Sequence, residues 1–180
     1  MGTTGTATTI STIESNNWSR CCVKPFVTDA KFFIENGTKL VNQEELNHLI
    51  DCDADPLVPR DWKVHSHRRR GMLGWNPQKI KLFFAPEQTG SSTIEGLELF
   101  KRLRTERVLN ANVLDYLLQH RELIPEEWKD YTVYFWGTVY IRCGELVVRC
   151  LFWNGFNWLE DFDTLDLSWN DEEPTVIYQP

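Results

Sequence analysis

The stretch TVYFWGTVYIRCGELVVRCLFWNGFNWLEDF, residues 132–162, decides the fold class of this chain. It contains three runs rich in β-branched and aromatic residues, the kind that favours strands: 132–142, 145–153 and 156–162. Cys143-Gly144 predicts a tight turn between the first two runs. Asn154-Gly155 is the strongest short hairpin signal in the chain, because a type I′ turn needs φ > 0 at both central positions. The stretch therefore predicts a three-stranded antiparallel meander, joined by a strand at 175–178.

Bulky side chains occupy both faces of the first predicted strand. Val133 and Phe135 alternate with Tyr134 and Trp136, whereas a sheet with one solvated face would carry polar residues at every second position. We expect the helices of the middle third to cover one face. The other face needs a cover from the N-terminal segment, the 53–77 loop, a second subunit or a ligand, and an uncovered aromatic face would be an interaction site.

Helical spacing of apolar residues marks the segments before the meander. It predicts a helix from Asn42 to about Cys52 and two helices over 93–106 and 111–120, while 79–84 alternates as a strand does. The predicted fold class is α+β: an antiparallel C-terminal β-meander packed against two or three helices, with a mixed N-terminal portion. Residues 1–20, rich in Thr, Ser and Asn, predict a flexible arm, and 21–180 a single domain.

Two segments resemble a group of short hypothetical bacterial proteins. VLNANVLDYLLQHRELIPEEWK and YFWGTVYIRCGELVVRCLFWNGFNW are similar to the helix, IPEEWK turn and FWGT-Y strand that occur in that order in the group. The resemblance covers about residues 94–170. The group carries no assigned activity, so the resemblance implies a natural structural unit and transfers no functional residue.

The charge of the chain is unevenly distributed. The formal net charge is −7, which argues against wholesale coating of nucleic acid. Residues 60–81 nevertheless contain seven Lys or Arg against the single acid Asp61, and residues 160–173 contain seven acids and no Lys or Arg. The two segments either pair with each other in the fold, or one of them binds a partner.

The basic segment is the first candidate site. It combines cations with aromatic rings, the mixture that a single-stranded nucleic-acid contact uses, and its central residues are Arg68, Arg69, Arg70 and Trp75. The alternative is a solvated loop whose arginines pair with the acidic segment and whose tryptophans pin it to the domain.

Metal and carboxylate chemistry gives the second group of candidates. Zinc prefers Cys and His ligands, and the chain offers these from three separate segments: Cys21, Cys22, His48, Cys52, His65 and His67. Alternating aspartates could serve a metal-dependent hydrolase: Asp51, Asp53 and Asp55, or Asp161, Asp163 and Asp166. Free thiols and ordinary acidic loops are the commoner outcome, and the segments lack Cys-x-x-Cys pairs and a complete calcium-loop pattern.

We expect the function to be that of a non-enzymatic binding or interaction module. Its predicted contact residues on the aromatic sheet are Trp136, Tyr140, Trp153 and Trp158. A nucleic-acid-associated protein is the second hypothesis, and a metal-dependent hydrolase is the third. We expect no cofactor, no membrane contact, and a protein partner or a homodimer. We expect the protein to be located in the cytoplasm, because the chain has five cysteines, an odd number, and no secretory signal.

Overall fold

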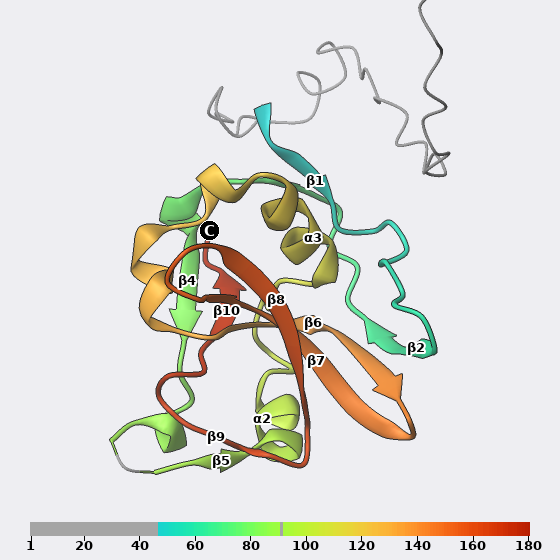
Figure 1. The fold of residues 1–180 in the computed structure, drawn as a ribbon, viewed down its shortest axis with the longest axis vertical. Helices are drawn as coiled ribbons and strands as arrows, with labels where there is room; N and C mark the ends of the chain where they lie inside the picture. The colour runs from blue at the N-terminus through green and yellow to red at the C-terminus, as the bar shows by residue number, and fades with distance from the viewer. Residues whose placement is uncertain (1–46, 91) are drawn as a thin grey trace, which may run out of the picture. The chain divides into compact units, whose positions relative to one another are not determined.

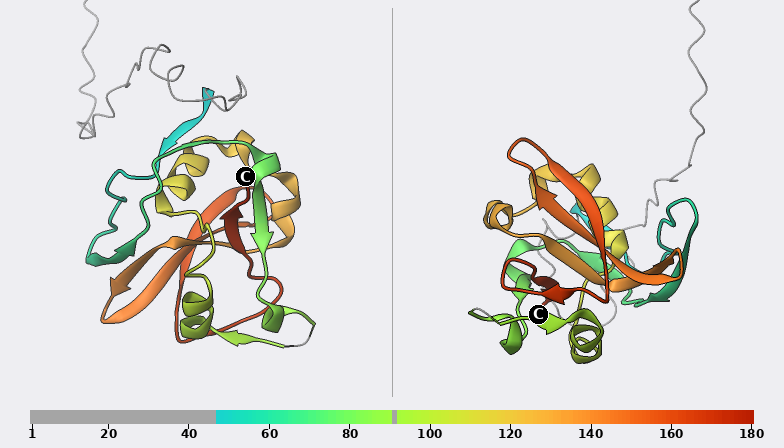
Figure 2. Two further views of the ribbon diagram at one scale, coloured as in Figure 1. Left: turned by 180° about the vertical axis from the view of Figure 1, so that it is seen from behind. Right: turned by 60° about the horizontal axis from the view of Figure 1, so that its bottom comes forward.

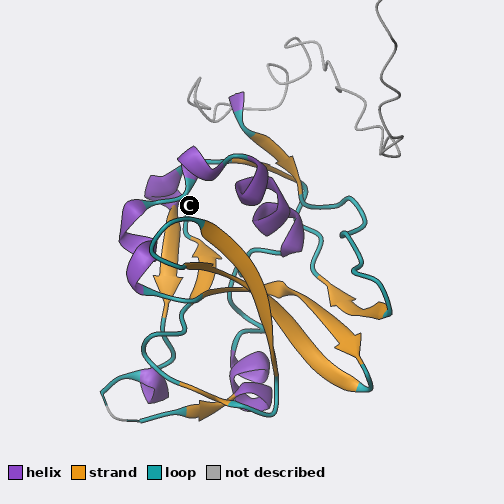
Figure 3. Cartoon of the chain, viewed as in Figure 1, coloured by secondary structure: helices purple, strands orange, loops and turns teal. Residues whose placement is uncertain are grey.

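The computed structural model describes residues 47–90 and 92–180, which belong to one compact unit, Leu40–Pro180. The α-helices that lie wholly within these residues are α2 (Gly96–Arg102) and α3 (Ala111–Gln119). The strands are β1 (Leu49–Asp51), β2 (Trp62–His67), β3 (Met72–Gly74), β4 (Ile80–Phe83), β5 (Ile94–Glu95), β6 (Val133–Arg142), β7 (Glu145–Trp153), β8 (Trp158–Thr164), β9 (Ser168–Trp169) and β10 (Thr175–Tyr178). Helices and a mostly antiparallel sheet together confirm the α+β class (Figure 3).

Part of the N-terminal prediction lies outside the described residues. This applies to the arm at 1–20, to Cys21 and Cys22, and to the start of the helix after Asn42. The continuation of that helix to Cys52 is wrong, because Leu49–Asp51 is a strand that pairs antiparallel with β3. The three- and four-residue spacing of its leucines is a local signal, and pairing with a distant segment overrides it.

The main sheet has six strands in the order β4-β10-β6-β7-β8, and β2 pairs with β6 off this path. Strand β6 is the central strand: β10 pairs with its first half in parallel and β2 with its second half antiparallel. The register between β6 and β7 shifts between Tyr134 and Val139, an irregularity that interrupts the ladder at the middle of β6. β8 is the last strand of the path.

Both predicted turns connect antiparallel strands, and they differ in turn type. Cys143 has φ 51° and Gly144 has φ 90°, so the two-residue loop between β6 and β7 is the type I′ turn. At the other turn only Gly155, with φ 94°, has a positive φ. The type I′ prediction for Asn154-Gly155 is therefore wrong. Asn154 instead accepts hydrogen bonds from the N–H groups of Phe156 and Asn157 at 2.9 and 2.8 Å.

Both faces of the sheet are covered within this chain. Val133 and Phe135 pack with Val113, Leu114 and Leu117 of α3. Figures 1 and 2 show α3 and α2 on opposite sides of the sheet, with β5 and β9 beside α2. The covering residues on the α2 side, which pack on Tyr134, Trp136 and Cys150, are Ile94, Leu99, Leu103, Leu165 and Trp169. The two middle helices take one face each. Of the four covers proposed for the second face, the 53–77 loop contributes, because Trp75 belongs to the core on the α3 side and the Trp62 ring lies 5.4 Å from the Tyr140 ring. The N-terminal segment lies outside the described residues.

Within residues 47–90 and 92–180, no helix is both long and apolar enough to cross a membrane.

Candidate functional site

Most of the predicted aromatic contact residues are core residues. Trp136 and Tyr140 are fully buried, and Trp75 and Trp158 are 3% and 4% exposed. Their prediction as binding residues is wrong in the described conformation, because the neighbouring helices and loops exclude a partner from the rings. Trp153 is partly buried and keeps Lys129 Nζ 4.3 Å from its ring centroid. It is the one predicted sheet ring that reaches the surface.

Two of the three consecutive arginines, Arg68 and Arg70, are held by the segment that follows α2. Arg68 donates to the carbonyl oxygens of Leu103 and Glu106 at 2.8 and 3.3 Å, and Arg70 donates to the carbonyl oxygen of Glu106 at 3.0 Å. Arg69 pairs with Asp55 at 2.7 Å. Cations beside carbonyl oxygens at a helix C-terminus are stabilising. These side chains therefore fasten the basic loop to the domain. The sequence also suggested that these arginines pair with the acidic segment 160–173. That interpretation is wrong, because their partners are Leu103, Glu106 and Asp55.

Two of the carboxylates considered for catalysis, those of Asp51 and Asp53, accept hydrogen bonds from backbone N–H groups and so stabilise loops. Asp51 accepts from the N–H groups of Asp53 and Ala54, and Asp53 accepts from Gly71 N at 2.7 Å. Among the described residues, no three His, Cys, Asp or Glu side chains gather as metal ligands do. Burial raises the pKa of Cys52 to about 12, so its thiol is protonated at neutral pH.

His67 belongs to a polar junction at the start of α3. Its Nδ1 lies 2.8 Å from Thr138 Oγ1, which accepts from Ala111 N at 3.0 Å. Asn110 donates to the carbonyl oxygens of Cys52 and Arg68 at 2.9 and 3.1 Å. Burial lowers the pKa of His67, since the charged imidazolium is poorly solvated there. The hydrogen bonds of this junction connect β2, β6 and α3. Its residues therefore stabilise the fold.

A buried ion cluster connects α3 to the sheet. Arg149, on β7, is 4% exposed and donates to Asp115 of α3 at 2.6 Å and to Glu160 of β8. Burial raises the pKa of Asp115, although Arg149 opposes that shift. The two carboxylates neutralise one cation, which leaves this cluster with an excess of negative charge.

The acidic segment 160–173 is not neutralised by the basic segment. No ion pair joins the two segments among the residues that the structure describes, and Glu160 is the one acid of the seven that pairs with a cation there. Tyr134 donates to Asp163, and Asp166 accepts from Thr164. Burial raises the pKa of Glu173, and the nearby Asp163 adds to that shift. The segment therefore carries a strong excess of negative charge.

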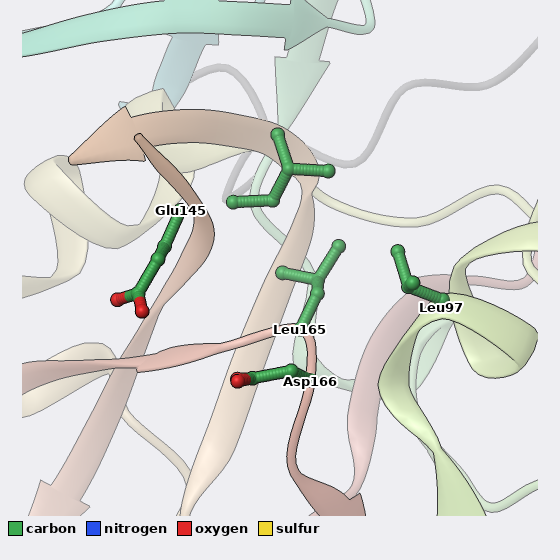
Figure 4. A pocket seen from close by; sticks show the side chains of 5 residues that line it. Leu97, Glu145, Leu165 and Asp166 are labelled. Carbon is green, nitrogen blue, oxygen red and sulfur yellow. The ribbon is translucent and has the colours of Figure 1, made fainter. Parts of the chain in front are cut away.

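A small pocket opens at this acidic segment. Its volume is about 160 Å³, and it is lined by Leu97 of α2, Glu145 and Leu146 at the start of β7, and Leu165 and Asp166 after β8. Figure 4 shows Leu97 and Leu165 facing each other, with the carboxylates of Glu145 and Asp166 on the side away from Leu97. The pocket thus has a leucine-lined interior and an acidic rim.

The size of the pocket limits what it can hold. At about 30 Å³ per water molecule, the volume of about 160 Å³ corresponds to roughly five waters. Sites for cofactors and drug-sized ligands are typically about 300–1,000 Å³. The pocket therefore fits one long side chain, or a group of that size, and is too small for a nucleotide.

Comparison of the chain with protein-family models, curated proteins and solved structures finds no match.

Sequence reasoning named Asp166 only as a possible metal-binding carboxylate and missed the pocket itself, because Leu97, Glu145 and Asp166 come from three separate segments. One signal did point toward them: the run of acids at 160–173 with no Lys or Arg between them. The structure adds Glu145 to that run by placing the start of β7 beside the end of β8, where Leu165 N donates to Leu146 O at 2.9 Å.

Proposed function

We propose that this domain is a protein-interaction module that binds a basic segment of a partner protein. The observation that carries the proposal is the pocket at Leu97, Leu146 and Leu165, with the carboxylates of Glu145 and Asp166 at its rim. Lys and Arg have an apolar stem and a charged head, so a side chain of this kind matches a leucine-lined pocket with an acidic rim. The proposed role is still the non-enzymatic binding expected from the sequence. The proposed binding surface is the pocket and not the aromatic rings, most of which are buried.

The electrostatics of the surroundings favour the same class of partner. The pocket lies at a segment with seven acids, of which Glu160 alone pairs with a cation within the described part of the chain. Such a potential attracts cationic partners and repels nucleic acid. The arginines that would contact phosphates already donate to carbonyl oxygens and to Asp55.

Binding of a basic peptide tests the proposal. The probe is a fluorescein-labelled, capped heptapeptide with Lys at positions one, three, five and seven and Val between them. Fluorescence anisotropy should show binding that weakens as salt is raised, because salt screens charge attraction at exposed sites. The same peptide with Glu in place of Lys should not bind.

Paired variants assign the binding to the pocket. Glu145→Gln/Asp166→Asn should lower the affinity for the lysine peptide at least about tenfold, since hydrogen bonds to charged groups contribute about 1.5–3 kcal/mol each. The matched control is Asp171→Asn/Glu172→Gln, which removes two exposed acids of the same segment that do not line the pocket. Equal losses in the two variants, or no binding of the lysine peptide at all, would refute the proposal.

A further inference from the structure

β8 is an edge strand beside the pocket. It pairs with β7 along its whole length, from Trp158 opposite Trp153 to Thr164 opposite Val147, and it ends the strand path of the main sheet. The chain then continues into Leu165 and Asp166, which line the pocket. An edge strand presents backbone N–H and C=O groups that another strand can use.

The hairpin geometry indicates which backbone groups face outward. Asn154 N donates to Asn157 O at 3.2 Å, so the hydrogen-bonded pairs of this antiparallel ladder alternate from that position. Asp161 and Asp163 therefore bond toward β7, whereas Glu160, Phe162 and Thr164 turn their N–H groups away from it. Phe162 N accordingly donates to the side chain of Asp161 at 2.9 Å rather than to β7.

The side chains of β8 alternate with the same period of two. Asp161, Asp163 and Leu165 share the face on which α2 packs, because Leu165 belongs to the core on that side. A strand added along β8 would carry every second side chain on this face, past two aspartates and toward the pocket. The face therefore favours a strand with Lys or Arg at alternate positions.

A second copy of this chain fits the edge poorly. Pairing β8 with β8 would bring the rows of Glu160, Asp161 and Asp163 against each other, and like charges on neighbouring strands are destabilising. Charged edge strands commonly prevent aggregation in this way. The same charges that repel another copy attract a cationic strand.

We propose that the basic partner segment binds as an extended strand hydrogen-bonded to the outer edge of β8, with one Lys or Arg side chain in the pocket. This inference rests on the proposed function and adds the backbone conformation of the partner. The main-chain hydrogen bonds supply affinity, and the pocket and aspartates select basic residues at alternate positions.

N-methylation of the peptide tests the backbone contacts. One version of the lysine–valine heptapeptide is methylated at its valine nitrogens and the other at its lysine nitrogens. In an added strand, alternate N–H groups face β8, so one version should lose affinity at least about tenfold while the other stays close to the parent peptide. Equal affinities of the two versions, whether both unchanged or both reduced, would overturn the inference.

Amide hydrogen exchange measured by NMR gives an independent readout without altering the protein. Saturation with the parent peptide should slow exchange at Glu160, Phe162 and Thr164, while Asp161 and Asp163 should be protected with and without peptide. Absence of this two-residue period overturns the inference. If the peptide still binds and still depends on Glu145 and Asp166, the proposed function stands without it. If the peptide does not bind, both proposals fail.

Discussion

At the scale of single residues, Gly137 shows how a close backbone contact restricts the sequence of β6. Gly137 N donates to Leu109 O at 2.8 Å, and a Cβ at this position would lie 2.7 Å from Asn110 Cα and 2.7 Å from Leu109 O. Both neighbours are backbone atoms of the segment that leads into α3. They cannot yield as the end of a flexible side chain would.

We expect Gly137→Ala to destabilise the protein by about 3 kcal/mol, since overpacking at a site without room costs about 1–3 kcal/mol or more. Gly71→Ala is the control, because Gly71 has φ 73° and no atom within 4 Å of the added Cβ. Gly71→Ala should lower the free energy of unfolding by about 1 kcal/mol, and only because alanine disfavours a positive φ. Urea unfolding measures both. A smaller loss at Gly137 than at Gly71 would contradict the steric argument.

At the scale of elements, the polar junction around His67 joins β2 to β6 and the start of α3. The imidazole Nδ1 lies 2.8 Å from Thr138 Oγ1, and Asn110 Nδ2 lies 3.5 Å from Nε2. Burial and the nearby Arg69 both disfavour a positive charge on the ring. The carbonyl oxygens of Cys52 and Ala54 and the Asp55 carboxylate favour that charge, but burial is the largest effect. The folded state therefore prefers the neutral imidazole.

This preference predicts a loss of stability in mild acid. The pKa of His67 is lower in the folded than in the unfolded state, so below about pH 6.5 the unfolded chain binds more protons. Stability should then fall as pH decreases from 6.5 toward the folded-state pKa, and level off below it. Urea unfolding between about pH 7.5 and 5 measures the slope.

Two histidine variants separate this effect from other titrations. His67→Asn should reduce the slope, whereas His65→Asn, at an exposed position of the same strand, should keep it. The two variants share every other titrating group, including Asp115 and Glu173, whose pKa values burial raises. An unchanged slope in His67→Asn would show that another group is responsible.

At the scale of the whole molecule, the ion cluster of Arg149 connects the α3 layer with two strands of the sheet. The Arg149 side chain is 5% exposed, against 22% for Asp115 and 52% for Glu160. A buried charge is expensive unless it is paired, and removal of one partner leaves the other without compensation. Apolar residues of similar volume are often tolerated in place of the whole pair.

We expect Arg149→Met to cost about 3 kcal/mol and Arg149→Met/Asp115→Leu to recover at least about half of that loss. Glu160 is half exposed and can turn to solvent. The surface pair Arg102–Glu87, with both side chains 43% exposed, is the control, and Arg102→Met should cost less than about 1 kcal/mol. If the double variant is no more stable than Arg149→Met in urea unfolding, uncompensated charge on Asp115 does not cause the loss.

Local pattern alone was enough for the α+β class and for the segments of residues 132–162 and 175–178 that form β6, β7, β8 and β10. Alternation of side chains and the glycines of tight turns act over a few neighbouring residues, so they can be read from the chain. The acidic run at 160–173 was visible in the same way.

Only the tertiary structure decided which aromatic rings are buried, what the arginines contact and where the pocket lies. Trp136 is covered by α2 and β9, Arg68 donates to Leu103, and Glu145 lies near Asp166 because separate segments meet in space. Composition indicates that a large ring will be buried or will bind a partner, and cannot distinguish the two. The difference depends on long-range packing, which no short stretch of sequence encodes.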